Sequence, residues 1–264
     1  MRWSFLQDTT SARDLLLDCR SEAQYAAGTL PGAYGAALVK KPIGSGPKSQ
    51  EFLNGMVQAV KKLAKDKETV VCFDEGQGMY ASRMAWILRS AGLKNAMLLS
   101  RKFSDFSTQD LKAGPGQIEP EGASARSSPG MIMLINHLQK ELTRVQLIDA
   151  RTPEEYEGEL PRMISPEPGS MCGRIPGSIN WDWRSLYNQE GVLRDKMEII
   201  MDIKRMGFMQ ERPTVIYDFN GARSCTMALV MHCCGYRNIS VYLGSWMEWR
   251  KSNLPKQNFH PWLN

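Results

Sequence analysis

Residues 214–224 read TVIYDFNGARS, and this stretch decides the fold. Its opening residues form a short apolar run that is typical of a buried strand, and the residues from Asp218 onward form a tight loop. An apolar helical pattern that includes Cys225–Cys234 follows. A strand, a tight loop and a helix in this order predict one unit of an α/β sheet, with the loop at the carboxyl end of the strand.

The same unit occurs in the first half of the chain. Residues 69–74, TVVCFD, echo the TVIYD of 214–218. Residues 15–21, LLLDCRS, echo the QLIDART of 146–152, and the LPGA of 30–33 echoes the IPGS of 175–178. The number of residues from the Pro-Gly pair to the later aspartate is almost the same in both halves. Two copies of one structural unit explain these matches.

The chain is therefore expected to form two tandem domains joined by a linker. We assign residues 1–111 to the N-terminal domain, residues 112–130, rich in Gly, Pro and Ser, to the linker, and residues 131–264 to the C-terminal domain. A longer interval before the second Pro-Gly pair predicts an inserted surface loop at 157–173. Strand-like runs alternate with helical patterns in each half, which predicts an α/β fold of two mostly parallel sheets, each covered by helices on both faces.

Composition narrows the classes of function. The hydrophobic content of 42% supplies a core for each domain. The net charge of +5 comes from scattered Lys and Arg, and acids interrupt the basic run at 61–68, so nucleic-acid binding is not expected. No apolar run is long enough for direct membrane insertion. Residues 1–10 resemble neither a signal peptide nor an Arg-rich presequence, so the protein is not imported or its presequence is missing from the sequence.

Metal and redox chemistry receive no support from the sequence. The six cysteines show no paired metal-ligand spacing and no density typical of a secreted disulfide framework, so a reducing compartment fits them best. The three histidines are widely dispersed. We expect no metal and no cofactor.

The loop at 218–224 is where the sequence places chemistry. In a parallel sheet, functional sites form where strands end and helices begin. The loop amides would converge on a central group, and the following helix would add the positive end of its dipole, so the loop favours an anion. A thiolate at the first loop position would have a lowered pKa and act as a nucleophile.

Four motifs in the second half resemble the rhodanese superfamily, specifically the two-domain thiosulfate and 3-mercaptopyruvate sulfurtransferases. They are the DAR of 149–151, the PGSIN of 176–180, the YDFNGARS of 217–224 and the GSWMEW of 244–249. The first half resembles the family less closely, because SRKF at 100–103 replaces the closing Gly-x-Trp element. The resemblance implies a noncatalytic first domain with an aspartate in the loop, here Asp74, and a second domain whose loop cysteine becomes a persulfide.

The chain departs from this pattern at Asp218, which stands where the resemblance places the cysteine. A carboxylate forms no persulfide, but it can accept hydrogen bonds from the loop amides and repel a second anion. No catalytic residue is therefore expected. The expected vestigial pocket consists of Asp218, Phe219, Asn220, Gly221, Ala222, Arg223, Ser224 and Arg151.

Two arginines of this pocket have structural interpretations. Arg151 could pair with Asp218 and close the site, or it could join Asp149 in holding the strand end, as Asp18 and Arg20 would in the first half. The second interpretation is favoured. Arg223 is interpreted as a residue that starts the helix.

The cysteines outside the loop offer one candidate for a substitute nucleophile. Cys225 lies seven residues past Asp218, so we expect it two turns into the helix as a packing residue. Cys172, in the inserted loop, is the candidate substitute thiol.

Three hypotheses for function follow. The leading one is a catalytically silent rhodanese-like protein that binds protein partners as a structural subunit of a larger assembly; the resemblance implies a mitochondrial location, with the cytoplasm as the alternative. The second is an active thiosulfate or 3-mercaptopyruvate sulfurtransferase that takes a small-molecule sulfur donor and uses a displaced cysteine. In the third, Asp218 itself acts as acid, base or nucleophile, but no second carboxylate is evident near the loop.

Overall fold

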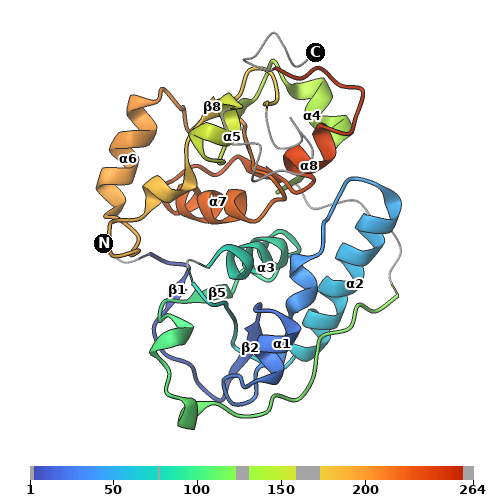
Figure 1. Ribbon diagram of the computed structural model, residues 1–264, viewed down its shortest axis with the longest axis vertical. Helices are drawn as coiled ribbons and strands as arrows, with labels where there is room; N and C mark the ends of the chain where they lie inside the picture. Colours follow the sequence, from blue (N-terminus) through green and yellow to red (C-terminus); the bar gives the residue numbers. More distant parts are fainter. Residues whose placement is uncertain (1–2, 77, 123–130, 159–172, 258–264) are drawn as a thin grey trace. The chain divides into compact units, whose positions relative to one another are not determined.

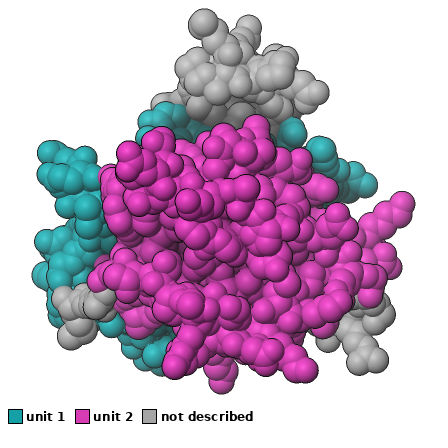
Figure 2. All heavy atoms as spheres, turned by 90° about the horizontal axis from the view of Figure 1, so that it is seen from below, with its two compact units in different colours: residues 1, 130–264 teal, residues 2–129 magenta. Residues whose placement is uncertain are grey.

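The computed structural model of the protein describes residues 3–76, 78–122, 131–158 and 173–257 (Figure 1). The chain divides into two compact units, one of residues 2–129 and one of residues 130–264 together with residue 1, which Figure 2 colours separately. We call them the first and the second unit in the order of the chain, so the first unit is magenta in Figure 2 (unit 2 of its key) and the second unit is teal (unit 1 of its key). Each has its own sheet and its own core.

The first unit contains a five-stranded sheet in the order β1-β5-β4-β2-β3, and every pairing is parallel. Its strands are β1 (Leu6–Gln7), β2 (Asp14–Asp18), β3 (Tyr34–Gly35), β4 (Thr69–Phe73) and β5 (Ala96–Leu99). Its helices are α1 (Glu22–Ala26), α2 (Pro47–Leu63) and α3 (Met79–Ser90), with short 3₁₀ turns η1 (Ala37–Lys40), η2 (Phe103–Asp105) and η3 (Thr108–Asp110).

The second unit repeats this arrangement. Its sheet is again five-stranded and parallel, in the order β6-β10-β9-β7-β8. The strands are β6 (Ile132–Met133), β7 (Gln146–Asp149), β8 (Ile179–Asn180), β9 (Thr214–Tyr217) and β10 (Ile239–Tyr242). The helices are α4 (Ile135–Glu141), α5 (Pro153–Glu157), α6 (Lys196–Arg205), α7 (Arg223–Cys233) and α8 (Ser245–Trp249), with the 3₁₀ turn η4 (Trp183–Leu186).

The shared strand order confirms the predicted fold of two tandem α/β domains. In each unit the strand that precedes the predicted loop, β4 or β9, lies at the centre of the sheet between two parallel neighbours. Both strands are apolar and rich in valine or isoleucine, and they are almost wholly buried, as central strands of a covered parallel sheet are. Their carboxyl ends therefore hold the two loops on rigid supports.

The segment assigned to the linker is more closely packed than its composition suggests. Lys112 pairs with Thr29, and Gln117 pairs with Gly35, in isolated bridges. Ile118 is buried, and the Tyr25 hydroxyl donates to the Gly116 carbonyl at 2.8 Å. A side chain at Gly114 would collide with Tyr25, so glycine here permits a close approach. The beginning of the expected linker thus belongs to the first unit, and residues 123–130 lie outside the described residues.

The expected insertion at 157–173 falls mostly outside the described residues, which stop at Gly158 and resume at Gly173. Where the chain resumes, Arg174 pairs with Gln257 in an antiparallel bridge. Within the described ranges, no helix combines the length and the apolar character that a membrane crossing requires.

Candidate functional site

The loop after β9 is clamped by the turn that opens α8. The Asp218 carbonyl accepts from the Trp246 amide at 2.9 Å, and the Phe219 carbonyl accepts from the Met247 amide at 2.9 Å. The Asp218 amide donates to the Ser245 hydroxyl at 3.2 Å, and that hydroxyl donates to the Tyr242 carbonyl at 2.7 Å. Two segments distant in sequence, 217–224 and 244–249, therefore form one rigid structure.

Backbone conformation supports this clamp at two positions. Ser245 has a φ of +52°, which L-residues seldom adopt, and its hydroxyl holds the first residue of the loop. Gly221 has a φ of +83°, and a Cβ there would lie 2.7 Å from the Leu243 carbonyl oxygen. Glycine at position 221 is therefore required both by its conformation and by the close approach of residue 243.

The Asp218 carboxylate occupies the centre of this loop. One oxygen accepts from the amides of Asn220 at 2.6 Å and Gly221 at 2.5 Å, and the other accepts from the Ser224 amide at 2.7 Å. Asp218 is completely buried. The amides that could bind a foreign anion thus donate to a carboxylate of the chain itself, through charge-assisted hydrogen bonds.

The loop after β4 has the same design in a more open form. One Asp74 oxygen accepts from the amides of Gly76 at 3.2 Å and Gly78 at 3.1 Å. The other accepts from Tyr80 at 2.9 Å and Ala81 at 3.1 Å. Asp74 is only half-buried. Both copies of the repeat therefore place a carboxylate among the loop amides, and only the second seals it from solvent.

Arg151 holds the end of strand β7. Its guanidinium grips both oxygens of Asp149, with the shortest contact at 2.6 Å, and donates to the Gly173 carbonyl at 2.6 Å. Arg20 does the same in the first unit with Asp18 and the Gly28 carbonyl. Burial lowers the pKa of Arg151, but the Asp149 carboxylate outweighs this effect and raises it above its ordinary value. The duplicated geometry favours the strand-end role over a lock on Asp218.

Arg223 forms a buried ion pair that sequence reasoning missed. It is the first residue of α7, as a helix-start residue should be, and its two terminal nitrogens contact the two Glu155 oxygens at 2.6 and 2.9 Å. Glu155 also caps helix α5, because its carboxylate accepts from the Thr152 amide and its own amide donates to the Thr152 hydroxyl. The capping-box pattern of residues 152–155 could have predicted this cap, but not the ion pair with Arg223.

This ion pair changes the charges around the loop. Burial alone would raise the pKa of Glu155, but hydrogen bonds and charge from Arg223 lower it. Burial would lower the pKa of Arg223, but the Glu155 hydrogen bonds and the negative charges of Asp218 and Glu155 raise it. A second carboxylate therefore does lie near the loop, contrary to the sequence-based expectation, and Arg223 already neutralises it.

The described cysteines lie outside the centre of the loop. Cys225 is the third residue of α7, so the prediction that it lies two turns into the helix was wrong: the helix begins at Arg223, after the loop. Its thiol is buried and donates to the Gly221 carbonyl at 3.0 Å. Burial raises the pKa of Cys19 and raises that of Cys234 to about 11. Cys172, the candidate substitute thiol, lies outside the described residues.

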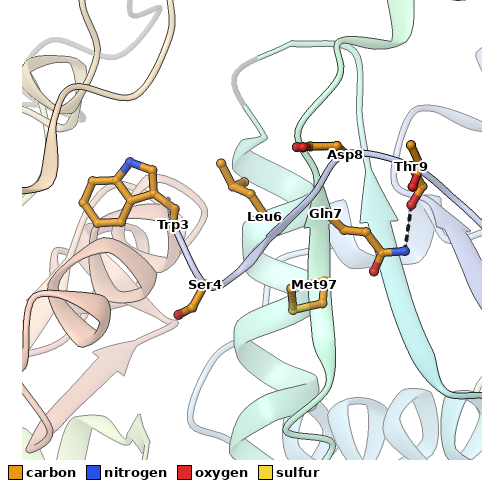
Figure 3. A pocket seen from close by; sticks show the side chains of 7 residues that line it. All are labelled: Trp3, Ser4, Leu6, Gln7, Asp8, Thr9 and Met97. Atoms are coloured by element: carbon orange, nitrogen blue, oxygen red, sulfur yellow. Dashed lines mark hydrogen bonds between the residues drawn. The ribbon is translucent and has the colours of Figure 1, made fainter. Parts of the chain in front are cut away.

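A metal site and an open pocket are the two other features that could bind a ligand. Among the described side chains, no group of three or more His, Cys, Asp or Glu could hold a metal ion. An open pocket of about 510 Å³ runs along edge strand β1 of the first unit (Figure 3), lined by Trp3, Ser4, Leu6, Gln7, Asp8, Thr9 and Met97. None of the described residues of the Asp74 loop lines this pocket.

Comparison with known proteins agrees with the geometry. The model of the rhodanese-like domain matches the chain twice, at residues 4–109 and 134–252. The chain belongs to the rhodanese-like domain family. The first match includes all five strands of the first sheet, and the second includes β7 to β10 of the second sheet and the loop after β9, so each unit of this rhodanese-like protein contains one copy of the domain.

Similar proteins include sulfurtransferases. The 3-mercaptopyruvate sulfurtransferase of Mus musculus is 31% identical over 192 residues, which are 71% of this chain and 64% of the mouse protein. The thiosulfate sulfurtransferase of Azotobacter vinelandii is 26% identical over 259 residues, covering 92% of this chain and 91% of the relative. This chain therefore aligns with somewhat less than two thirds of the mouse relative and with most of the bacterial one.

Solved structures show the same fold. A probable thiosulfate sulfurtransferase superimposes with a TM-score of 0.62 at 23% identity, covering 94% of this chain and 99% of that one. The wild-type structure of EanB superimposes with a TM-score of 0.70 at 19% identity, covering 96% of this chain and 65% of that one. At these identities the likeness shows the fold alone.

Proposed function

We propose that this rhodanese-like protein is catalytically silent, and that it acts as a binding or structural subunit with protein partners. The observation that carries the proposal is the buried Asp218 carboxylate, which accepts three loop amides at the place where the family resemblance puts a cysteine. Asp74 in the other domain supports it, because neither loop contains a thiol at this position.

Sulfur transfer requires an atom that the loop lacks. A thiolate attacks the outer sulfur of thiosulfate, a new sulfur–sulfur bond forms, the old one breaks, and sulfite leaves with the bonding electrons. A cyanide ion or a thiol then takes the outer sulfur from the persulfide. The Asp218 carboxylate offers only oxygen, which forms no persulfide. The chemical step therefore has no nucleophile at this position.

Binding of an anionic donor is opposed as well. The amides of Asn220, Gly221 and Ser224 already donate to Asp218, so they are not available to a ligand. An entering dianion would meet the carboxylate charge a few ångströms away in a site without solvent. Loss of donor binding and loss of turnover are thus expected together.

Two activity assays test the proposal. Purified protein is incubated with thiosulfate and cyanide, or with 3-mercaptopyruvate and a thiol. We expect no thiocyanate and no sulfide above the rate without protein. Sustained turnover by the wild-type protein would overturn the proposal.

A second candidate function is sulfur transfer by a displaced cysteine, favoured by the similarity of the chain to sulfurtransferases. Cys172 is the candidate nucleophile and would take thiosulfate or 3-mercaptopyruvate as sulfur donor. Turnover that disappears in Cys172→Ser but persists in Cys225→Ser would establish it. The buried Cys225 serves as the matched control, because its thiol is engaged by the Gly221 carbonyl.

Retention of both loops and domains without a nucleophile supports protein partners, and the family resemblance supports the compartment. We propose a mitochondrial location, with the cytoplasm as the alternative. We also propose that the surface of the protein binds the other subunits of a larger assembly. Fractionation of the native source followed by co-purification tests both points. A protein that elutes from the native source as a free monomer would contradict the proposed role as a subunit.

A further inference from the structure

The second unit presents large apolar side chains to solvent, and they are concentrated at helix α6. Within the described part of the chain, the exposed large apolar residues are Ile179, Val192, Met197, Met201 and Met209. All of them belong to the second unit, and all but Ile179 lie on α6 or within four residues of its ends. Such a concentration is typical of a surface that binds a partner.

The corresponding helix of the first unit does not show this exposure. Helices α2 and α6 each precede the central strand of their sheet. After its first residue, α2 exposes only polar side chains, those of Lys48, Glu51, Gln58 and Lys62. Its methionine, Met56, is completely buried. Exposed methionines at this place in the fold are therefore specific to the second unit.

Helix α6 has one face that packs against its own unit and one that does not. Ile199 and Ile203 lie four residues apart and are completely buried. Met197 and Met201 also lie four residues apart, and they are 56% and 51% exposed. Residues with this spacing share one face of a helix, so the two methionines form an apolar stripe on the outer side. The flexible, apolar methionine side chain suits a binding surface.

Two charged side chains flank Met201 on the exposed face. Glu198 precedes Met201 by three positions and Arg205 follows it by four, so both lie on the same side of the helix as Met201. Within the unit, Glu198 contacts Arg194 at 3.3 Å, and Arg205 contacts Asp202 at 3.2 Å. Glu198 and Arg205 are exposed, and ion pairs between exposed side chains contribute little to stability. Both charges can therefore exchange partners at low cost.

The positions of these charges suit a second copy of the same helix. In an antiparallel pair of α6 helices with a twofold axis at Met201, Glu198 of each copy lies beside Arg205 of the other. This follows because the two residues are almost equidistant from Met201 along the helix. The arrangement forms the ion pair twice, and it covers the methionine stripes of both copies.

We propose that α6 is a self-association surface through which two copies of this protein form a twofold-symmetric dimer. Met201 lies at the axis, and Glu198 pairs with Arg205 of the second copy. The inference goes beyond the proposed function, because it does not depend on the loss of the sulfur nucleophile. It assigns a second copy of this chain as the occupant of the exposed stripe.

Sedimentation equilibrium of the purified protein measures the association. We expect the wild-type protein to sediment with twice the mass of one chain at tens of micromolar. Met201→Asp places two carboxylates against each other at the axis and should raise the Kd of the dimer by about tenfold or more. Ile179→Asp is the matched control, because it introduces the same charge at an exposed apolar residue of the second unit that lies outside α6. It should leave the Kd unchanged.

Charge reversal tests the pairing across the axis. Glu198→Arg alone and Arg205→Glu alone each place like charges side by side, and each should raise the Kd by about tenfold. The double variant restores opposite charges and should recover the wild-type Kd to within about threefold. Circular dichroism checks that each variant is folded. A double variant that dimerises no better than the single variants would overturn the proposed arrangement.

The outcomes separate this inference from the proposed function. A wild-type protein that sediments as a monomer at every concentration would overturn the inference, and so would a dimer that Met201→Asp leaves intact. Neither result bears on sulfur transfer. Turnover by the wild-type protein in the activity assays would overturn the proposed function and leave the dimer intact.

Discussion

In each domain, backbone amides of the loop donate hydrogen bonds to an aspartate, but the surroundings of the two aspartates differ. Asp74 is half-buried, and its carboxylate accepts hydrogen bonds from four amides at 2.9–3.2 Å. Asp218 is fully buried, and its carboxylate accepts hydrogen bonds from three amides at 2.5–2.7 Å. The ion pair of the second loop, Arg223 with Glu155, is buried, whereas that of the first loop joins Arg20 to the exposed Glu75. Water can solvate the first carboxylate, so its loop tolerates change, but the second depends on each of its partners.

The largest contrast is expected from removing the two carboxylates. Asp218→Ala leaves three buried amides without acceptors and should lower the free energy of unfolding by roughly 4 kcal/mol. Asp74→Ala should cost about 1 kcal/mol, because water can reach the freed amides. Urea denaturation of both variants measures the difference. Equal losses would show that the burial of Asp218 has no energetic consequence.

Breaking the ion pair should have the next largest effect. Glu155→Gln removes the ion-pair partner of the buried Arg223, and we expect a loss of about 3 kcal/mol in the free energy of unfolding. The matched variant in the first domain, Gln24→Ala, removes only a helix cap and should cost about 1 kcal/mol. If Glu155→Gln lowers the free energy of unfolding no more than Gln24→Ala does, then water solvates the Arg223 charge once its partner is removed.

Replacing Gly221 should have a smaller effect on stability, caused by its positive φ and by the nearby Leu243 carbonyl. Gly221→Ala combines an unfavourable φ with a Cβ 2.7 Å from the Leu243 carbonyl oxygen, and should cost about 2 kcal/mol or more. Gly177→Ala is the control, because Gly177 has a similar φ of +79° with nothing within 4 Å of an added Cβ. It should cost about 1 kcal/mol. Thermal unfolding of the two variants measures the difference: Gly177→Ala reports backbone strain alone, and Gly221→Ala reports the same strain together with the steric clash.

Acid should weaken the second domain through Glu155. The pKa of Glu155 is lowered in the folded protein, so the unfolded chain binds the proton more readily as the pH falls. The stability that Glu155 contributes is therefore present above its unfolded pKa of about 4.3 and is lost as the pH falls through the lower, folded value. Glu155→Gln should reduce the acid slope of stability by at most about 1.4 kcal/mol per pH unit. An unchanged slope would contradict this assignment.

The sequence predicted the parts of the structure that depend on local patterns. The duplicated strand runs and the Pro-Gly motifs revealed two tandem α/β domains, and the order of strand, loop and helix placed Asp74 and Asp218 among the loop amides. Gly221 falls within the predicted tight loop, and the structure shows its positive φ of +83°, which few other residues adopt. These features could be predicted because each depends on residues that lie close together in the sequence.

Features that depend on tertiary contacts could not be predicted. Glu155 and Arg223 are 68 residues apart, and nothing in their local patterns indicates that they meet. Arg223 does start α7 as expected, but the depth of Cys225 in the helix was overestimated, because it was counted from Asp218 and the intervening residues form the loop. The expected linker carries glycines that allow close packing against Tyr25, a role that composition does not distinguish from flexibility.

The central claim is that the wild-type protein, with Asp218 in its loop, has no nucleophile that takes sulfur from thiosulfate, and intact-mass measurement after incubation with thiosulfate tests it most directly. We expect the wild-type protein to gain no mass, and Asp218→Cys to gain one sulfur atom that a reductant removes. A wild-type protein that gains a reducible sulfur atom on one of its own cysteines would contradict the claim.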